Sequence, residues 1–155
     1  RSVHGIRRLK MEEFVVGPLM TVREPDELVV SVRFPSSPSG GSVGTSFQEI
    51  SERHGDFAVV AVAAQLKFDN EVCSLASISF GGVDDKPIRI PELEAILTGQ
   101  AITEEMFTDV REVIFDTANP SSDQHATAGY RRRVAGELAI RAIAEAAYEA
   151  RGGGM

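Results

Sequence analysis

A run of proline, serine and glycine in the first third of the chain divides this sequence into two parts. The run reads Pro35-Ser36-Ser37-Pro38-Ser39-Gly40-Gly41-Ser42. Its side chains have little apolar surface to bury, and its two prolines cannot donate hydrogen bonds to a strand ladder. We therefore interpret the run as an exposed loop between two structural units.

The part before this loop contains a pattern that favours a strand. Apolar side chains recur at every second position over residues 28–34, and a period of two is typical of a strand with one buried face. The side chains of that face are Leu28, Val30, Val32 and Phe34. Glu24-Pro25-Asp26 is typical of a turn, so we expect a turn followed by a strand.

The part after the loop begins with segments that predict a small antiparallel sheet. Ser46–Arg53 favours a short helix, and the valine-rich run Ala58–Phe68 favours a strand, with a buried helix as the alternative. Asp69-Asn70 is then the turn of a hairpin, Val72–Phe80 is its return strand, and Ile88–Ile90 adds a third strand.

The remainder of the chain has helical spacing. Pro91 favours a helix start, with Gly99 as its stop. Thr103 is expected to cap a second helix, which Asn119-Pro120 would end. A last helix follows Ser121-Ser122-Asp123, and its apolar stripe would be Tyr130, Val134, Leu138, Ala142 and Ile143. Strands followed by helices predict an α+β fold.

The composition excludes several classes of function. A net charge of -7 and a pI near 5.0 argue against nucleic acid as a partner. Cys73 is the only cysteine, which excludes an internal disulfide and fits a reducing cytoplasm. No apolar stretch approaches the roughly 20 residues needed to span a bilayer. The chain starts at Arg1 rather than at a methionine, as expected of a fragment or a processed product.

Histidine and arginine side chains give no independent sign of a catalytic or metal site. His54 and His125 lack accompanying ligands at metal-binding spacing, which favours surface histidines. Residues 131–133 are consecutive arginines that point in different directions on a helix, so we expect a solvated helix start, with subunit docking as the alternative.

Four segments carry a family resemblance, in the same order along the chain. They are Phe14–Pro18 continued through Thr21 to Pro25–Leu28, then Phe47–Ala58, then Gly81-Gly82-Val83, and finally Ser122-Asp123 continued through Tyr130–Val134. Together they resemble the C-terminal half of the FAD-binding medium subunits of molybdenum hydroxylases of the carbon monoxide dehydrogenase type.

The resemblance implies the fold and the domain boundaries. We expect a small antiparallel sheet packed with helices, similar to the flavoprotein C-terminal domain, preceded by the last strands of the FAD-binding domain. Residues 1–36 would be the tail end of the FAD-binding domain, residues 37–45 a linker, and residues 46–151 the flavoprotein C-terminal domain.

The resemblance also implies an oxidoreductase of several subunits. A molybdenum subunit with molybdopterin oxidises the substrate, an iron–sulfur subunit relays electrons, and FAD on the medium subunit passes them to an external acceptor. The glycine-rich loops that hold the FAD diphosphate belong to the N-terminal part of the medium subunit, and this sequence contains neither loop. We expect the chain alone to be inactive. Carbon monoxide, an aldehyde and an N-heterocycle are all open as substrates.

The resemblance places Gly55, Asp56 and Phe57 beside the flavin ring, and Gln48 nearby. An aromatic ring can pack on a flavin, and neighbouring polar groups can tune it. The alternative is a core turn, with Gly55 at the bend, Asp56 as its cap and Phe57 in the core. Some relatives have tyrosine at position 57 and lysine at position 48.

A stand-alone interaction module with the same fold but without flavin chemistry is the alternative function. The missing glycine-rich loops support it. An upstream reading frame that encodes these loops would favour the flavoprotein instead.

Overall fold

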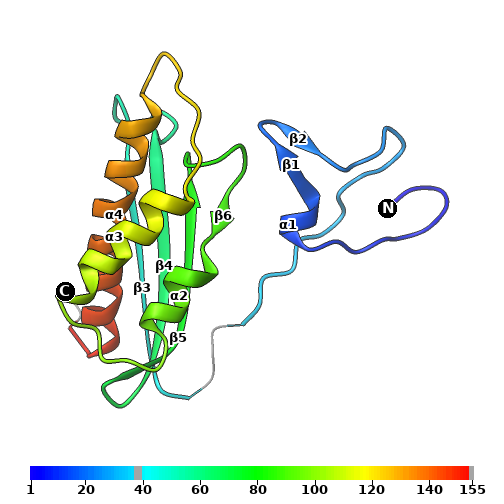
Figure 1. The fold of residues 1–155 in the computed structure, drawn as a ribbon. Coiled ribbons are helices and arrows are strands. Elements are labelled where there is room, and N and C mark those ends of the chain that lie inside the picture. Colours follow the sequence, from blue (N-terminus) through cyan, green and yellow to red (C-terminus); the bar gives the residue numbers. More distant parts are fainter. Residues whose placement is uncertain (37–39, 154–155) are drawn as a thin grey trace. The chain divides into compact units, whose positions relative to one another are not determined.

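The computed structural model of the protein describes residues 1–36 and 40–153. The chain divides into two compact units, with the boundary between residues 37 and 38. Each unit is described by itself, and Figure 1 labels the helices and strands of both.

The first unit is small and built around one pair of short strands. It contains α1 (Met11–Phe14), β1 (Val15–Gly17) and β2 (Met20–Thr21), and the two strands pair antiparallel. The expected turn near Pro25 is confirmed, because the Glu27 N–H donates to the Glu24 carbonyl at 3.0 Å. An ion pair then joins Arg7 to Glu27, whose side chains approach to 2.5 Å.

The strand expected over residues 28–34 is wrong for this structure. The segment forms no strand among the described residues, and its apolar side chains are exposed, with Phe34 at 82% exposure. A strand needs a neighbour to pair its backbone N–H and C=O groups. The alternating pattern is present in the sequence, but the described part of the chain supplies no partner strand for it.

The second unit contains a four-stranded sheet in the order β3-β4-β5-β6. Its strands are β3 (Ser42–Ile50), β4 (Val60–Asp69), β5 (Val72–Gly81) and β6 (Ile88–Arg89), and every neighbouring pair is antiparallel. This confirms the expected hairpin and its third strand. Asn70 makes the turn with a φ of 57°, a left-handed conformation that asparagine tolerates well.

The short helix expected over Ser46–Arg53 is wrong, because β3 runs through most of this segment. The inward positions of β3 include Ser46 and Gln48, whose side chains donate to a carboxylate oxygen of Glu145 at 2.5 and 2.6 Å. The buried face of this strand is therefore polar, and the sequence lacks the alternation that identifies a strand. The expected linker over residues 37–45 also overlaps β3, and residues 37–39 lie outside the described residues.

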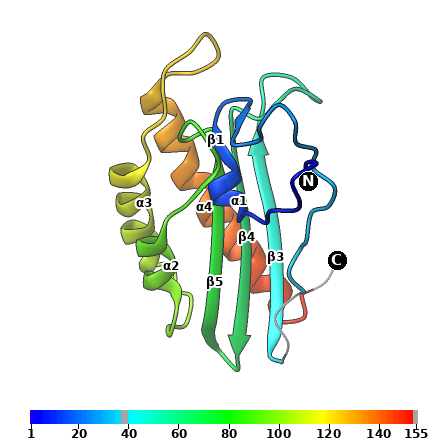
Figure 2. The same ribbon diagram turned by 90° about the vertical axis from the view of Figure 1, so that its right-hand side faces the viewer.

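Three helices cover one face of this sheet (Figures 1 and 2). They are α2 (Pro91–Leu97), α3 (Met106–Thr117) and α4 (Ala128–Ala150). The long α4 packs on β3 and β4, α2 packs on β5, and α3 lies against both other helices. The α+β fold expected from the sequence is confirmed.

The helix boundaries agree with some of the expected signals. Pro91 begins α2, and Gly99 follows its end with a φ of 83°. The cap expected at Thr103 is wrong, because α3 begins at Met106 and its N-cap residue is Glu105, with no side-chain cap hydrogen bond. Thr127 caps α4 by accepting the Tyr130 N–H at 3.2 Å.

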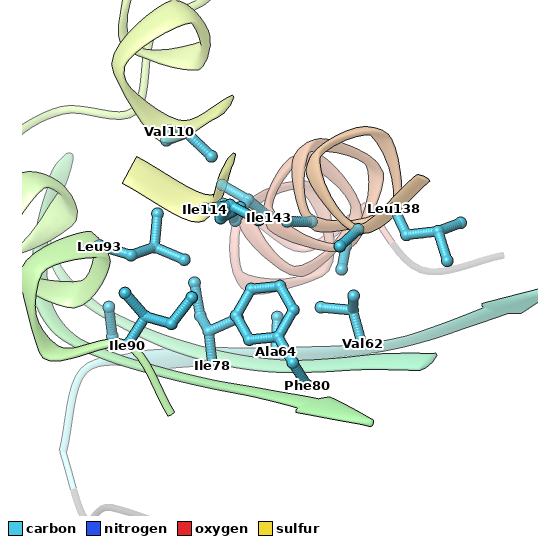
Figure 3. Packing of buried hydrophobic residues seen from close by; sticks show 14 of the residues in the cluster. Val62, Ala64, Ile78, Phe80, Ile90, Leu93, Val110, Ile114, Leu138 and Ile143 are labelled. Atoms are coloured by element: carbon cyan, nitrogen blue, oxygen red, sulfur yellow. The ribbon is translucent and has the colours of Figure 1, made fainter. Parts of the chain in front are cut away.

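The core lies between the sheet and the helices. Figure 3 shows Phe80, Ile78 and Val62 of the sheet directed toward the helix side chains Ile114 and Ile143. All five are fully buried. On α4 the expected stripe is correct for Leu138, Ala142 and Ile143, but it is wrong for Tyr130, which is exposed, and Val134 is only half-buried. Further small residues of α4 complete the buried face, among them Ala135, Ala139 and Ala146. In the described part of the chain, no helix is both long and apolar enough to cross a membrane.

Candidate functional site

The loop between β3 and β4, residues 51–59, carries the candidate residues at positions 55–57. Its two ends are held together where the Val59 N–H donates to the Ile50 carbonyl at 2.7 Å. Within the loop, the Asp56 N–H donates to the Arg53 carbonyl at 3.1 Å. Gly55 has a φ of 90°, which favours glycine, and a side chain added there would meet open space.

Phe57 is the most exposed phenylalanine among the described residues, at 98% exposure. Phe68 and Phe80, on the strands nearby in sequence, are buried in the core. The structure therefore excludes the alternative in which Phe57 fills the core of this unit, while Gly55 does make the bend. The Phe57 ring is solvent-exposed on a short loop whose two ends are hydrogen-bonded together. Its whole face is therefore available to pack against a flat partner.

Gln48 belongs to a different cluster from the loop residues. Its amide nitrogen donates to Glu145 of α4 at 2.6 Å, on the helix-covered side of β3. A direct contact between this amide and a ligand would require that hydrogen bond to break. The structure thus brings Gly55, Asp56 and Phe57 together on one loop and leaves Gln48 apart from them.

The base of the loop is held by Arg131, in the first turn of α4. Arg131 is 8% exposed, and one terminal nitrogen of its guanidinium donates to the Val59 carbonyl at 2.5 Å and to the Gly82 carbonyl at 3.2 Å. The other terminal nitrogen donates to an Asp123 carboxylate oxygen at 2.6 Å. We call this arrangement the Arg131 clamp. It joins the end of the loop, the end of β5 and the start of α4.

Asp123 is itself fixed by the backbone that follows it. Its second carboxylate oxygen accepts the N–H groups of His125 and Ala126, both at 2.9 Å. The Ala126 N–H, then the Arg131 guanidinium, lower the pKa of Asp123 from 3.8 to about 2. The carboxylate is therefore charged near neutral pH, and it orients the guanidinium.

Gly82 makes the close approach in the clamp possible. It has a φ of 77°, and a Cβ atom at this position would overlap the Val59 carbonyl oxygen. A larger residue would push the two carbonyls apart, and Arg131 could no longer reach both of them. Gly82 of the third resemblance segment thus has a structural reason.

Sequence reasoning missed Arg131, since the expected solvated helix start is wrong for this residue. The spacing contained a signal: Arg131 lies four residues before Ala135 and seven before Leu138, which are both buried on α4. The neighbouring Arg133 is exposed, and Arg132 donates to the Ala118 carbonyl at 2.8 Å.

His54 and His125 lie at the surface, as expected. The His125 ring lies 3.1 Å from the Glu52 carboxylate, which makes a second link between the loop and the segment before α4. Among residues 1–36 and 40–153, no group of histidine, cysteine, aspartate and glutamate is arranged to hold a metal ion. The site offers an exposed ring, accessible backbone and carboxylates.

Comparison with known proteins connects this fold to one family. The family described as the CO dehydrogenase flavoprotein C-terminal domain matches residues 45–146. The glyceraldehyde dehydrogenase medium chain of Sulfolobus acidocaldarius is 30% identical over 94% of this chain and 51% of its own length. The nicotine 6-hydroxylase medium subunit of Paenarthrobacter nicotinovorans is 33% identical over 94% of this chain and 50% of its own length.

Solved structures show the same likeness. A chain of reconstituted CO dehydrogenase from Oligotropha carboxidovorans matches 94% of this chain and 50% of its own length, with a TM-score of 0.86 and 28% identity. A chain of quinoline 2-oxidoreductase from Pseudomonas putida 86 matches 96% of this chain and 51% of its own length, with a TM-score of 0.87 and 29% identity. The chain therefore spans about half the length of the relatives that it matches.

Proposed function

Because the chain belongs to the family of CO dehydrogenase flavoprotein C-terminal domains, we propose that it is the C-terminal half of the FAD-binding medium subunit of a molybdenum hydroxylase. In this proposal residues 1–36 are the end of the FAD-binding domain and residues 46–151 are the flavoprotein C-terminal domain. The missing first half of the subunit supplies the loops that hold the FAD diphosphate.

The observation that carries this proposal is the exposed ring of Phe57 on a tied loop. A flavin ring is flat and largely apolar, and an aromatic side chain packs well on such a surface. The open space at Gly55 lets a ligand approach the backbone closely. The residues present therefore fit a flavin, with Phe57 covering the ring and the loop backbone beside it.

The remaining candidate residues have supporting roles in this proposal. Asp56 is exposed beside Phe57, where a carboxylate or its backbone N–H can orient a polar edge of the cofactor. Gln48 acts on the site through β3, because its amide holds the strand on Glu145. The chemistry that FAD would supply when bound is to accept electrons from iron–sulfur clusters and to deliver them to an external acceptor.

The partners in this proposal are the first half of the same subunit, an iron–sulfur subunit and a molybdenum subunit. The relatives include the medium chain of a glyceraldehyde dehydrogenase, the medium subunit of a nicotine 6-hydroxylase and the beta subunit of a caffeine dehydrogenase. Such diversity on one fold is expected if the substrate is bound elsewhere in the complex, since specificity resides in sites and not in folds.

The test is to reduce the assembled complex with its substrate and to follow iron–sulfur bleaching and flavin reduction separately. Phe57→Ala should lower flavin content or slow flavin reduction while leaving iron–sulfur bleaching unchanged. Phe115→Ala is the matched control, because Phe115 is another exposed phenylalanine, at 56% exposure on α3. Unchanged flavin content and reduction in Phe57→Ala would show that the loop is no part of the flavin site.

A further inference from the structure

We propose that Arg131 is a positioning residue that sets the orientation of Phe57 toward its ligand, acting through the Val59 carbonyl. This inference rests on the proposed function, because it takes the ligand of Phe57 to be a flavin. It goes beyond that function by assigning a role to a buried side chain on a different element from the loop.

Arg131 carries a buried charge. Burying a guanidinium is unfavourable unless hydrogen bonds compensate it. The other buried positions of α4 hold only glycine, alanine, leucine or isoleucine, as at Ala135 and Leu138. Arg131 instead places a charge at the end of the sheet, where its guanidinium donates hydrogen bonds to two backbone carbonyls and one carboxylate.

One of those carbonyls lies at the end of the loop that carries Phe57. Val59 is two residues after Phe57, so its carbonyl is a fixed point close to the exposed ring without belonging to it. The Val59 N–H is also engaged, by the Ile50 carbonyl. With both of its backbone groups held, Val59 defines the direction in which the loop leaves the sheet. The tip of the loop can then hold Phe57 exposed for a ligand without contributing to the core.

The groups of the Arg131 clamp are themselves held in place by further contacts. Asp123 is held by two backbone N–H groups, and its charge fixes the fork of the Arg131 guanidinium. Gly82 allows the second carbonyl to lie close to the first. A lysine at position 131 would keep the charge, but a single ammonium lacks the planar fork that serves all three acceptors.

The test uses the complete medium subunit with FAD and measures the dissociation constant of FAD in four variants. Arg131→Lys should raise this constant about tenfold, which corresponds to the loss of one charge-assisted hydrogen bond. Arg133→Lys, in the same helical turn but exposed, should leave it unchanged. Arg131→Lys combined with Phe57→Ala should differ from Phe57→Ala alone by less than about twofold, because the arginine acts through that ring.

Hydrogen exchange of the same subunit provides a readout without the cofactor. In Arg131→Lys the Val59 amide should exchange faster, while the Leu66 amide in the middle of β4 should keep its protection. If Arg131→Lys is too unstable to purify, Asp123→Asn leaves both carbonyl contacts in place and should shift both measurements in the same direction by a smaller factor.

The possible outcomes separate the two proposals. An effect of Phe57→Ala on FAD binding with none from Arg131→Lys and Asp123→Asn overturns the positioning role and leaves the proposed function standing. If Arg131→Lys raises the dissociation constant of FAD by the same factor with and without the Phe57 ring, Arg131 has a general structural role. That result also overturns the positioning role. No effect of Phe57→Ala overturns the proposed flavin contact, and the role of Arg131 toward flavin falls with it.

Discussion

At the scale of single residues, Gly44 determines how closely α4 approaches β3. A Cβ atom at this position would overlap the carbonyl oxygen of Ala146 on the helix. The close approach brings Glu145 and Glu149 within reach of the polar groups of β3, including the Thr45 N–H. Hydrogen bonds can replace apolar contacts on this strand because no side chain separates the two backbones at Gly44.

We expect Gly44→Ala to lower the free energy of unfolding by about 2–4 kcal/mol, because the strand or the helix must shift to remove the overlap. Gly136→Ala on α4 is the matched control. Its added methyl group would make an ordinary contact with Arg111 at 3.5 Å, so the higher helix propensity of alanine should stabilise the chain by about 0.5–1 kcal/mol. Urea unfolding measures both, and a Gly44→Ala variant as stable as the parent would contradict the packing described.

The pKa of Asp123 makes a prediction about acid stability. Its folded value of about 2 lies below its ordinary value of 3.8. The ionised carboxylate therefore stabilises the fold above about pH 4, and that contribution is lost as the pH falls from 3.8 toward 2. The urea midpoint should fall across this window, and more shallowly in Asp123→Asn. Parallel pH profiles for parent and variant would show that Asp123 has no such role.

At the scale of elements, the sequence predicted those that bury a strongly apolar face. The strands β4 and β5 combine a long valine-rich or isoleucine-rich run with a turn at Asn70, and both are present. The strand β3 was missed because its inward side chains Ser46 and Gln48 are satisfied by Glu145, a contact far away in sequence. No local pattern encodes that pairing.

The candidate site could be predicted only in part for the same reason, because local patterns do not encode contacts between residues far apart in the sequence. The resemblance identified the loop that carries Phe57, while the burial of Arg131 depends on acceptors from two strands. Helical spacing places Arg131 on the buried face of α4, but it does not show which carbonyls receive its hydrogen bonds. A charged residue on a buried face is therefore a useful signal of a long-range polar contact.

Amide exchange tests the difference between the strands and the segment at residues 28–34. The centres of β4 and β5 should be protected up to the global free energy of unfolding, because their backbone groups pair within the sheet. Residues 29–34 should exchange at rates close to those of an unstructured chain, since the described part of the chain offers them no partner strand, whereas the Leu28 N–H donates to the Arg1 carbonyl at 2.9 Å. Slow exchange throughout residues 29–34 in a demonstrated monomer would contradict this expectation.

Across the whole chain, the two units differ in how much of their apolar surface they bury. The second unit has a continuous core that involves its sheet and three helices. The first unit leaves a row of apolar side chains exposed, from Leu28 to Phe34. When a sheet is divided between two pieces of chain, a strand-forming apolar segment is left without a neighbouring strand to pair with. This agrees with the proposal that the preceding half of the subunit carries the rest of that sheet.

In the proposed function, this chain supplies one wall of an FAD site whose phosphate-binding loops lie in the preceding half of the subunit. The dissociation constant of FAD tests this directly when it is measured for the complete subunit, for its first half alone and for this chain alone. We expect tight binding by the complete subunit, weaker binding by the first half, and no stoichiometric binding by this chain. Tight binding by this chain alone, or equal affinity of the first half with and without it, would show that this chain is not a wall of the FAD site.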